Sequence, residues 1–304
     1  MSAVPKEAGG QEKSWLPLNM KRGLANETAD IDKNISATLA STYVPFTPLL
    51  NAHSGAVSIV GSGPSLKSTW QKLKGDVMAC NSAGKFLLEK GVVPKYWMMF
   101  DADPLLIHSI RPHKDVTYLV ASRCHRSVFE LLKDCKVYVW HAKGDLNLDE
   151  LLEKEMARRH AMTGKWELEP MCGGGSTAVT RCMFLVYAFG YRTQHLFGVD
   201  SSYDVDFHVS GESADDHQQK RMIISTGPRN PRQFNTTTWL AAQAEDFMVL
   251  SKTLKELNVK IVVHGTGLIP HLAGELGFDV DGQSKLYQVG RDVAQKTRLL
   301  WNVI

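Results

Sequence analysis

The sequence lacks the features that mark membrane, secreted and zinc-stabilised proteins. No apolar run approaches the about 18 consecutive residues that a membrane-spanning helix needs. Residues 1–13 carry charges but no apolar stretch like that of a secretory signal. The five cysteines form no CxxC pair and no zinc-ligand spacing, and their odd number fits reduced thiols. We therefore expect a cytoplasmic protein without a membrane span.

An excess of charge of one sign is also missing. The formal net charge is +3 with the histidines neutral. Domains that bind nucleic acid carry a strong basic patch, so an excess this small gives no support for such a partner. We expect no nucleic acid among the ligands.

What the chain has is the composition of an ordinary globular protein. Of its 304 residues, 43% are hydrophobic and 22% are charged. A chain of this length can bury a sizeable core without disulfides. Residues 1–52 are polar and show little sustained period, which predicts a partly ordered N-terminal arm that the core fold can lose. We expect a single nucleotide-binding domain over residues 53–304.

Short apolar runs separated by turn signals follow Ala56. Most are continuously apolar, as in strands that are covered on both faces, and helical patterns lie between several of them. This alternation predicts an α/β fold with a mainly parallel sheet and right-handed crossovers. The expected strands cover residues 56–60, 76–80, 96–100, 117–121, 136–141, 195–199 and 260–264. The expected helices cover residues 65–73, 82–90, 127–134, 176–189 and 236–257.

The segment 201–235 differs from its surroundings. It is rich in polar residues and poor in apolar ones. A long polar loop inside a compact domain is usually a lid or a binding loop, and we expect one here.

A glycine-rich turn, Gly61-Ser62-Gly63-Pro64-Ser65, joins the first expected strand to a helix. Such a turn lets the backbone approach a phosphate, and a helix N-terminus adds free N–H groups. Pro64 suits a helix start, and Ser65 can cap the helix or donate to a phosphate oxygen. Leu66 stands where GxGxxG has its third glycine, and no Walker motif is present. A tight structural turn is the alternative; if phosphate binds here, Gly63→Val should abolish nucleotide binding and leave the fold intact.

Polar residues also end the next two strands. Asn81 follows the second strand and can read a base, a ribose or a phosphate, or cap the helix that starts near Ser82. Asp101 and Asp103 follow the third strand, and two such carboxylates suit Mg²⁺ or Mn²⁺ bound together with a diphosphate. Turn formation before Pro104 is the alternative. These ends lie at the sheet edge where open α/β proteins bind ligands.

Three further features could contribute to the same edge. Gly174, Ser176 and Thr177 lie in a second glycine-rich turn before a helix, which is either an anion site or a device for close helix packing. Arg181, on that helix, is expected at the surface or in an ion pair. Asp200 ends another strand, and the polar loop after it supplies His208 and the other candidates, His217, Lys220, Arg221, Arg229 and Arg232. Either histidine could serve as a general base.

Taken in order, these motifs resemble a known family. The segments IVGSGPSL, CNSA, FDADP, GGGST and LFGVDSSY, spread over residues 56–275, are similar to the 6-hydroxymethylpterin diphosphokinase-like proteins and the motility accessory factor glycosyltransferases. A more distant resemblance is to the Rossmann-like bacterial sialyltransferases. The resemblance implies a Rossmann-like three-layer fold and a nucleotide-dependent transferase.

The resemblance also implies roles for individual residues. Gly61 to Ser65 would hold the donor phosphate, and Asn81 would contact the nucleotide. Asp101, with Asp103, would face the transferred group or its metal. Asp200 would face the donor or the acceptor, and His208 would be the base. The loop around His208 departs from the sialyltransferase pattern in length and composition, which leaves the identity of the base open.

Three functions compete on this basis. The first is a glycosyltransferase that uses a nucleotide-activated sugar such as a CMP-nonulosonate and a small-molecule or glycan acceptor. The second is an ATP- and Mg²⁺-dependent diphosphokinase acting on a pterin hydroxymethyl group. The third is a non-catalytic nucleotide-binding module. A dehydrogenase fits less well, because no acidic residue ends the second strand.

Overall fold

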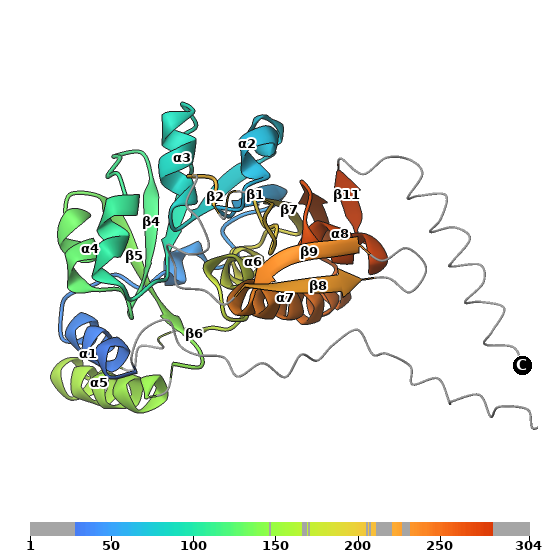
Figure 1. The fold of residues 1–304 in the computed structure, drawn as a ribbon. Coiled ribbons are helices and arrows are strands. Elements are labelled where there is room, and N and C mark those ends of the chain that lie inside the picture. Colours follow the sequence, from blue (N-terminus) through green and yellow to red (C-terminus); the bar gives the residue numbers. More distant parts are fainter. Residues whose placement is uncertain are drawn as a thin grey trace, which may run out of the picture.

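The protein, described here from a computed structural model, is built on one large parallel sheet (Figure 1). The structure describes residues 28–281 except 146, 166–168, 170, 205, 207, 211–220 and 227–231. The described strands of this sheet are β1 (Ala56–Val60), β2 (Asp76–Cys80), β3 (Tyr96–Met99), β4 (Thr117–Ala121), β5 (Lys136–Ala142), β6 (Met171–Cys172), β7 (Thr193–Phe197), β10 (Lys260–His264) and β11 (Asp279–Asp281).

The strand order is β11-β10-β7-β1-β2-β3-β4-β5-β6, and every neighbouring pair is parallel. The chain therefore moves outward from β1 to β6, returns to the other side of β1 at β7, and continues to β11. Right-handed crossovers then require helices on both faces of the sheet. The expected α/β fold with a mainly parallel sheet is confirmed.

Helices cover the two faces of this sheet. On one side lie α2 and α3, and on the other lie α6 and α7 (Figure 1). The described helices are α1 (Thr28–Leu39), α2 (Leu66–Thr69), α3 (Ala83–Glu89), α4 (Arg126–Leu131), α5 (Leu148–Thr163), α6 (Ala178–Ala188), α7 (Thr238–Glu256) and α8 (Leu268–Glu275), with 3-10 turns at η1 (Thr47–Leu49), η2 (Trp70–Lys72) and η3 (Pro104–Ser109). Within the described ranges, no helix is both long and apolar enough to cross a membrane.

The core fills the space between the sheet and these helices. Its largest fully buried side chains include Trp97, Trp140, Tyr118, Phe189 and Phe247. Central strands are buried almost throughout; β3, for example, has no exposed residue. This burial explains why the strands read as continuous apolar runs in the sequence.

Residues 28–52, which we expected to belong to a partly ordered arm, contain ordered structure. Helix α1 lies beside α5 (Figure 1) and buries Ile31, Ile35 and Leu39 against Leu148 and Leu152. The side chain of Asn34 donates to Arg123 O (3.0 Å), and Thr38 donates to Ser122 O (3.0 Å), so α1 also contacts the end of β4. The boundary of the domain after residue 52 stays a prediction, and residues 1–27 of the expected arm lie outside the described residues.

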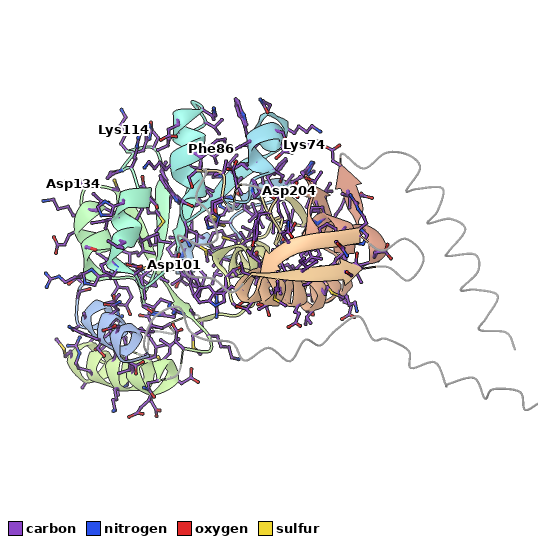
Figure 2. The ribbon with its side chains drawn as sticks, in the orientation of Figure 1. Lys74, Phe86, Asp101, Lys114, Asp134 and Asp204 are labelled. Atoms are coloured by element: carbon purple, nitrogen blue, oxygen red, sulfur yellow. The ribbon has the colours of Figure 1, made fainter. Side chains whose placement is uncertain are left out.

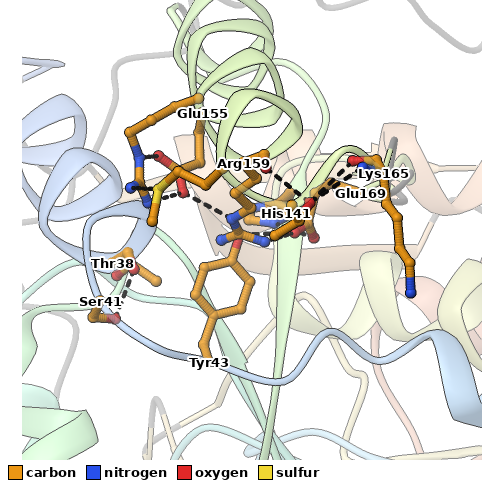
Figure 3. Close-up of polar contacts among 11 residues, drawn as sticks. Thr38, Ser41, Tyr43, His141, Glu155, Arg159, Lys165 and Glu169 are labelled. Atoms are coloured by element: carbon orange, nitrogen blue, oxygen red, sulfur yellow. Dashed lines mark hydrogen bonds and ion pairs between the residues drawn. The ribbon is translucent and has the colours of Figure 1, made fainter.

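A buried polar network fixes the segment that follows α1 (Figure 3). Glu169 Oε1 accepts from the Tyr43 hydroxyl (3.0 Å) and from Arg159 (2.7 Å), and its Oε2 lies 3.3 Å from His141 Nε2. Arg159 also donates to Glu155 (2.7 Å). Burial alone would raise the pKa of Glu169, but bonding to His141 and the Arg159 charge hold that pKa below its usual value. Residue 43 is thereby tied to α5 and β5.

The polar segment 201–235 is not one continuous loop. Strands β8 (Arg221–Thr226) and β9 (Arg232–Thr237) form an antiparallel hairpin that leads into α7. Exposure alternates along β8, where Met222 and Ile224 are partly buried and Ile223 and Ser225 are exposed, which suits a ribbon with one exposed side. The expectation of a single loop was wrong for residues 221–226 and 232–235, which belong to these strands.

Candidate functional site at the carboxyl edge of the sheet

The turn Gly61–Ser65 lies where the strand order reverses. It leaves β1, which has β7 on one side and β2 on the other. Open α/β sheets bind ligands at this kind of switch point, outside the carboxyl ends of the strands. The structure thus places Gly61, Ser62, Gly63, Pro64 and Ser65 at the expected edge.

Asp200, which follows β7, binds this turn directly. Its Oδ2 accepts from the Ser65 backbone N–H (2.8 Å), and its Oδ1 accepts from the Ser65 hydroxyl (2.5 Å). Only 2% of the residue is exposed. Burial raises the pKa of Asp200 to about 7, although both bonds from Ser65 oppose that rise. We infer that Asp200 positions the turn; its direct contact with a donor or acceptor stays a prediction.

The glycines of the turn allow two strand ends to approach each other. The Gly63 N–H donates to Gly198 O (2.8 Å). A Cβ atom on Gly63 would lie 2.6 Å from Asp200 Oδ2 and 2.7 Å from Gly198 O, and one on Gly61 would lie 2.6 Å from Gly198 O. The sequence reasoning assigned this space to a phosphate, whereas the structure fills it with β7 and the residues after it. Three N–H groups of the turn, on Gly61, Gly63 and Ser65, already have partners within the protein.

The second glycine-rich turn has the same construction. Asp246, from α7, accepts from the Ser176 N–H (2.7 Å) and from its hydroxyl (2.6 Å). Thr177 caps α6, and it forms a reciprocal pair with Thr180. Gly174 has a φ of +113°, which favours glycine. At the start of α6, a carboxylate of this chain therefore holds the position where we predicted a phosphate; phosphate binding at Gly174, Ser176 and Thr177 stays a prediction.

Asn81 links the ends of β2 and β3. Its Nδ2 donates to Asp101 Oδ2 (2.6 Å), and its Oδ1 accepts from the Phe100 N–H (3.1 Å). Ser82, not Asn81, occupies the N-cap position of α3, so Asn81 does not cap this helix. Asn81 has a φ of +43°, a left-handed conformation that asparagine tolerates better than most residues. The structure brings Asn81 and Asp101 together, as the shared sheet edge predicted.

Asp101 has an exposed surface, but many protein atoms surround its carboxyl group. Desolvation by these atoms raises the pKa of the carboxyl. The Arg123 charge lowers this pKa, and the nearby Asp103 carboxylate raises it. Asp103 Oδ1 accepts from the Leu105 N–H (2.8 Å) as the cap of η3, so the turn role that we considered for it is present. Metal binding by the two carboxylates stays a prediction.

His208 lies beside the first turn. Its Nδ1 is 3.2 Å from the Ser62 hydroxyl, and the next residue, Val209, donates its N–H to Ser62 O (2.7 Å). The imidazole is half-buried. The candidate base thus reaches the same edge as Asn81 and Asp101.

The other candidates of the polar segment contribute less to the described site. His217, Lys220 and Arg229 lie outside the described residues, as does the side chain of Arg221. Arg232 begins β9, and its guanidinium lies 5.8 Å from the Phe234 ring centroid.

Two buried arginines form a feature that the sequence reasoning missed. Arg181 was expected at the surface or in an ion pair, but Arg181 and Arg123 are each only 7% exposed. Arg123 donates to Asp145 (2.8 Å), and Arg181 donates to Cys172 O (2.8 Å). Both guanidinium groups lie over the Phe100 ring, at 4.6 and 5.1 Å. The sequence did contain one indication of this cluster, because Arg123 closely follows the buried strand β4.

Several polar atoms of this cluster lack a hydrogen-bond partner among the described residues. They include Nε of Arg123 and Arg181, Oδ2 of Asp145 and Nδ1 of His141. Buried polar atoms without partners are costly, so native proteins pair nearly all of them. The arginine cluster is therefore a buried polar feature near this edge whose hydrogen-bonding groups are not all paired within the described residues.

The fold and the site define a doubly wound α/β protein with a polar ligand edge at its switch point. A family model described as 6-hydroxymethylpterin diphosphokinase MptE-like matches residues 32–206, more than half of the chain. The chain belongs to this family, which confirms the resemblance found in the motifs. The matched region begins inside α1 and therefore includes part of the segment that we had assigned to the arm.

A solved structure shares the fold, and another is aligned with the chain at a lower TM-score. The MAf glycosyltransferase from Magnetospirillum magneticum AMB-1 has 14% sequence identity to this chain and superposes with a TM-score of 0.53. The alignment covers 82% of this chain and 38% of the glycosyltransferase chain. The chain thus spans well under half of that protein's length. The sialyltransferase CstII from Campylobacter jejuni is 15% identical with a TM-score of 0.36, covering 74% of this chain and 84% of its own. A search of curated proteins gave no match.

Proposed function

We propose that this protein is a nucleotide-dependent transferase that moves a sugar from a nucleotide-activated donor to an acceptor hydroxyl. The observation that carries the proposal is the position of His208. Its imidazole lies 3.2 Å from Ser62 Oγ at the switch point, at the same strand edge as the Asn81–Asp101 pair. A half-buried imidazole beside a ligand edge can act as a general base near neutral pH.

In the proposed reaction, the oxygen of the acceptor hydroxyl forms a bond to the anomeric carbon of the donor, and His208 takes the proton of that hydroxyl. The bond from that carbon to the phosphate oxygen breaks, and the nucleotide leaves with its electron pair. Asn81 contacts the nucleotide, and Asp101 orients the transferred group. Asp200 acts through Ser65, because it holds the turn and is itself buried. A CMP-nonulosonate is one donor of this class.

A diphosphokinase is the second candidate, and the Asp101–Asp103 pair favours it. Family membership supports it as well. Mg²⁺ is commonly bound by one or two carboxylates together with substrate phosphates. Asn81 and Leu105 each engage one oxygen of these carboxylates, and each carboxylate has a second oxygen for a cation. Here Mg²⁺ would neutralise charge on ATP, and the pterin hydroxymethyl oxygen would attack the β-phosphorus.

A nucleotide screen with a base-deficient variant tests these functions. Thermal shift with CMP, UDP, GDP and ATP, with and without Mg²⁺, identifies the donor. Turnover is then measured for the wild type, His208→Ala and the control His113→Ala. His113 precedes β4 and so lies toward the opposite edge of the sheet.

The expected result is that His208→Ala loses about 10²-fold or more in turnover while it still binds the nucleotide, whereas His113→Ala keeps activity. Binding without turnover by the wild type would identify a non-catalytic module instead. Absolute dependence on Mg²⁺ together with ATP would favour the diphosphokinase. Failure of all four nucleotides to bind would overturn the nucleotide-dependent assignment. A cytoplasmic location and a small-molecule or glycan acceptor stay part of the proposal.

A further inference from the structure

A groove opens beside the end of β2, next to Asn81. Its volume is about 650 Å³, and it is lined by Lys67 of α2, by Ser82, Lys85 and Phe86 at α3, and by Lys90 just after α3. Figure 2 shows Phe86 between the ribbons of α3 and α2. A volume of this size falls within the range of about 300–1,000 Å³ found for small-molecule sites.

The cations of the groove outnumber its anions. Lys67 pairs with Asp206 (2.5 Å), and the one acidic residue that lines the groove, Glu89, pairs with Arg111 (3.2 Å). In the part of the chain that the structure describes, the remaining two lysines have no carboxylate partner.

Lys85 and Lys90 therefore leave a positive charge that no described residue compensates. Lys85 is half-buried, and among the described residues its Nζ donates to the carbonyl oxygen of His108 (3.3 Å) alone. Lys90 Nζ lies 5.4 Å from the Phe86 ring centroid. After the two pairs cancel, Lys85 and Lys90 contribute two charges to one groove wall.

The glycine-rich turns do not supply this charge. Their donors at Ser65 and Ser176 already bind Asp200 and Asp246, so a phosphate at either turn would meet a carboxylate of the protein. A phosphate ligand at this edge needs positive charge from side chains, and the groove beside Asn81 provides it.

From this charge balance we propose that Lys85 and Lys90 bind the diphosphate of a nucleoside diphosphate donor. This inference rests on the proposed function and narrows its substrate class. A diphosphate that bridges a nucleoside and a sugar carries two negative charges on adjacent phosphates, which match the two lysines. The phosphate of a CMP-sugar carries only one, and the second charge of a CMP-nonulosonate lies on the carboxylate of the sugar. Ser82, at the same groove, adds a hydroxyl that can donate to a phosphate oxygen. The nucleoside would extend toward Asn81.

Binding affinities of the full-length protein test this inference. Calorimetry compares ADP, GDP, UDP and CDP with their monophosphates, and pyrophosphate with orthophosphate as base-free probes. The variants are Lys85→Gln and Lys90→Gln. Lys133→Gln is the control, since Lys133 is also exposed but follows α4, away from the groove.

At least one diphosphate should bind about tenfold or more tightly than its monophosphate, and pyrophosphate should compete better than orthophosphate. Lys85→Gln should lower the affinity for that diphosphate by about tenfold, and Lys90→Gln should lower it by about threefold. The control variant should keep the wild-type affinity. Equal affinity for monophosphate and diphosphate, or a Lys85→Gln variant that behaves like the control, would overturn the inference and leave the proposed function standing. Absence of binding by every nucleotide would overturn both.

Discussion

Replacing Gly63 with alanine should destabilise the fold, which differs from the effect we expected from the sequence. A Cβ atom at this position would lie 2.6 Å from Asp200 Oδ2 and 2.7 Å from Gly198 O, closer than real contacts allow. The strand ends must separate, which strains or breaks the Gly63 N–H bond to Gly198 O and the Ser65 bonds to Asp200. Overpacking costs about 1–3 kcal/mol, and loss of bonds to a buried group adds about 1–3 kcal/mol. We expect a loss of about 3 kcal/mol.

Urea denaturation of the apo protein measures this loss, with thermal melting as a second readout. At this chain size about 3 kcal/mol corresponds to a fall in Tm of about 6–12 °C. The control is Gly173→Ala, because an added Cβ there meets nothing within 4 Å; its stability should stay within about 0.5 kcal/mol of the wild type. If Gly63→Ala keeps wild-type stability but loses nucleotide affinity, the turn binds phosphate and the packing argument is refuted.

Three further predictions follow from the buried groups and the N-terminal segment. The pKa of Asp200 is raised to about 7, so between about pH 4 and 7 the folded state keeps a proton that the unfolded state has lost. The free energy of unfolding therefore falls as the pH rises through this range, by up to about 4 kcal/mol. Asp200→Asn should remove this component of the pH–stability profile. Asp101→Asn should keep the fold and lower turnover by about 10²-fold, and retained activity in a steady-state assay would exclude a catalytic role. A chain starting at Asn51 should melt well below the full chain, because it loses the buried face of α1; an unchanged Tm would support a dispensable arm.

Much of the sheet could be predicted because its strands are covered on both faces. Such strands appear in the sequence as short, continuous apolar runs, as at β1, β2 and β4. The expected bounds of these three strands match those of the structure. Helix α5, Leu148–Thr163, was missed because seven of its 16 residues are charged and it buries only a narrow stripe against α1. Helix α1 was missed for a related reason: its apolar residues find their partners in α5, more than one hundred positions away.

The candidate site was predictable in its location but not in its internal contacts. Strand ends in a parallel sheet meet at one edge, so the proximity of Asn81 and Asp101 follows from topology. The partner of Ser65 is 135 positions away at Asp200, and that of Ser176 is 70 positions away at Asp246. Local motifs cannot show such partners, which is why the sequence left phosphate binding and a purely structural role as alternatives for both turns. The same limit applies to Arg181, whose burial depends on the ends of β5 and β6.

The proposed reaction requires that a nucleotide binds at the carboxyl edge beside Asn81 and that His208 acts on the acceptor there. A crystal structure of the full-length protein with the tightest-binding nucleoside diphosphate shows whether both hold. We expect phosphate oxygens within hydrogen-bond distance of Lys85 Nζ, the nucleoside against Asn81, and the scissile end facing His208 and Asp101. A nucleotide bound at the opposite edge of the sheet, or one held by the turns after displacement of Asp200 or Asp246, would contradict the proposed reaction.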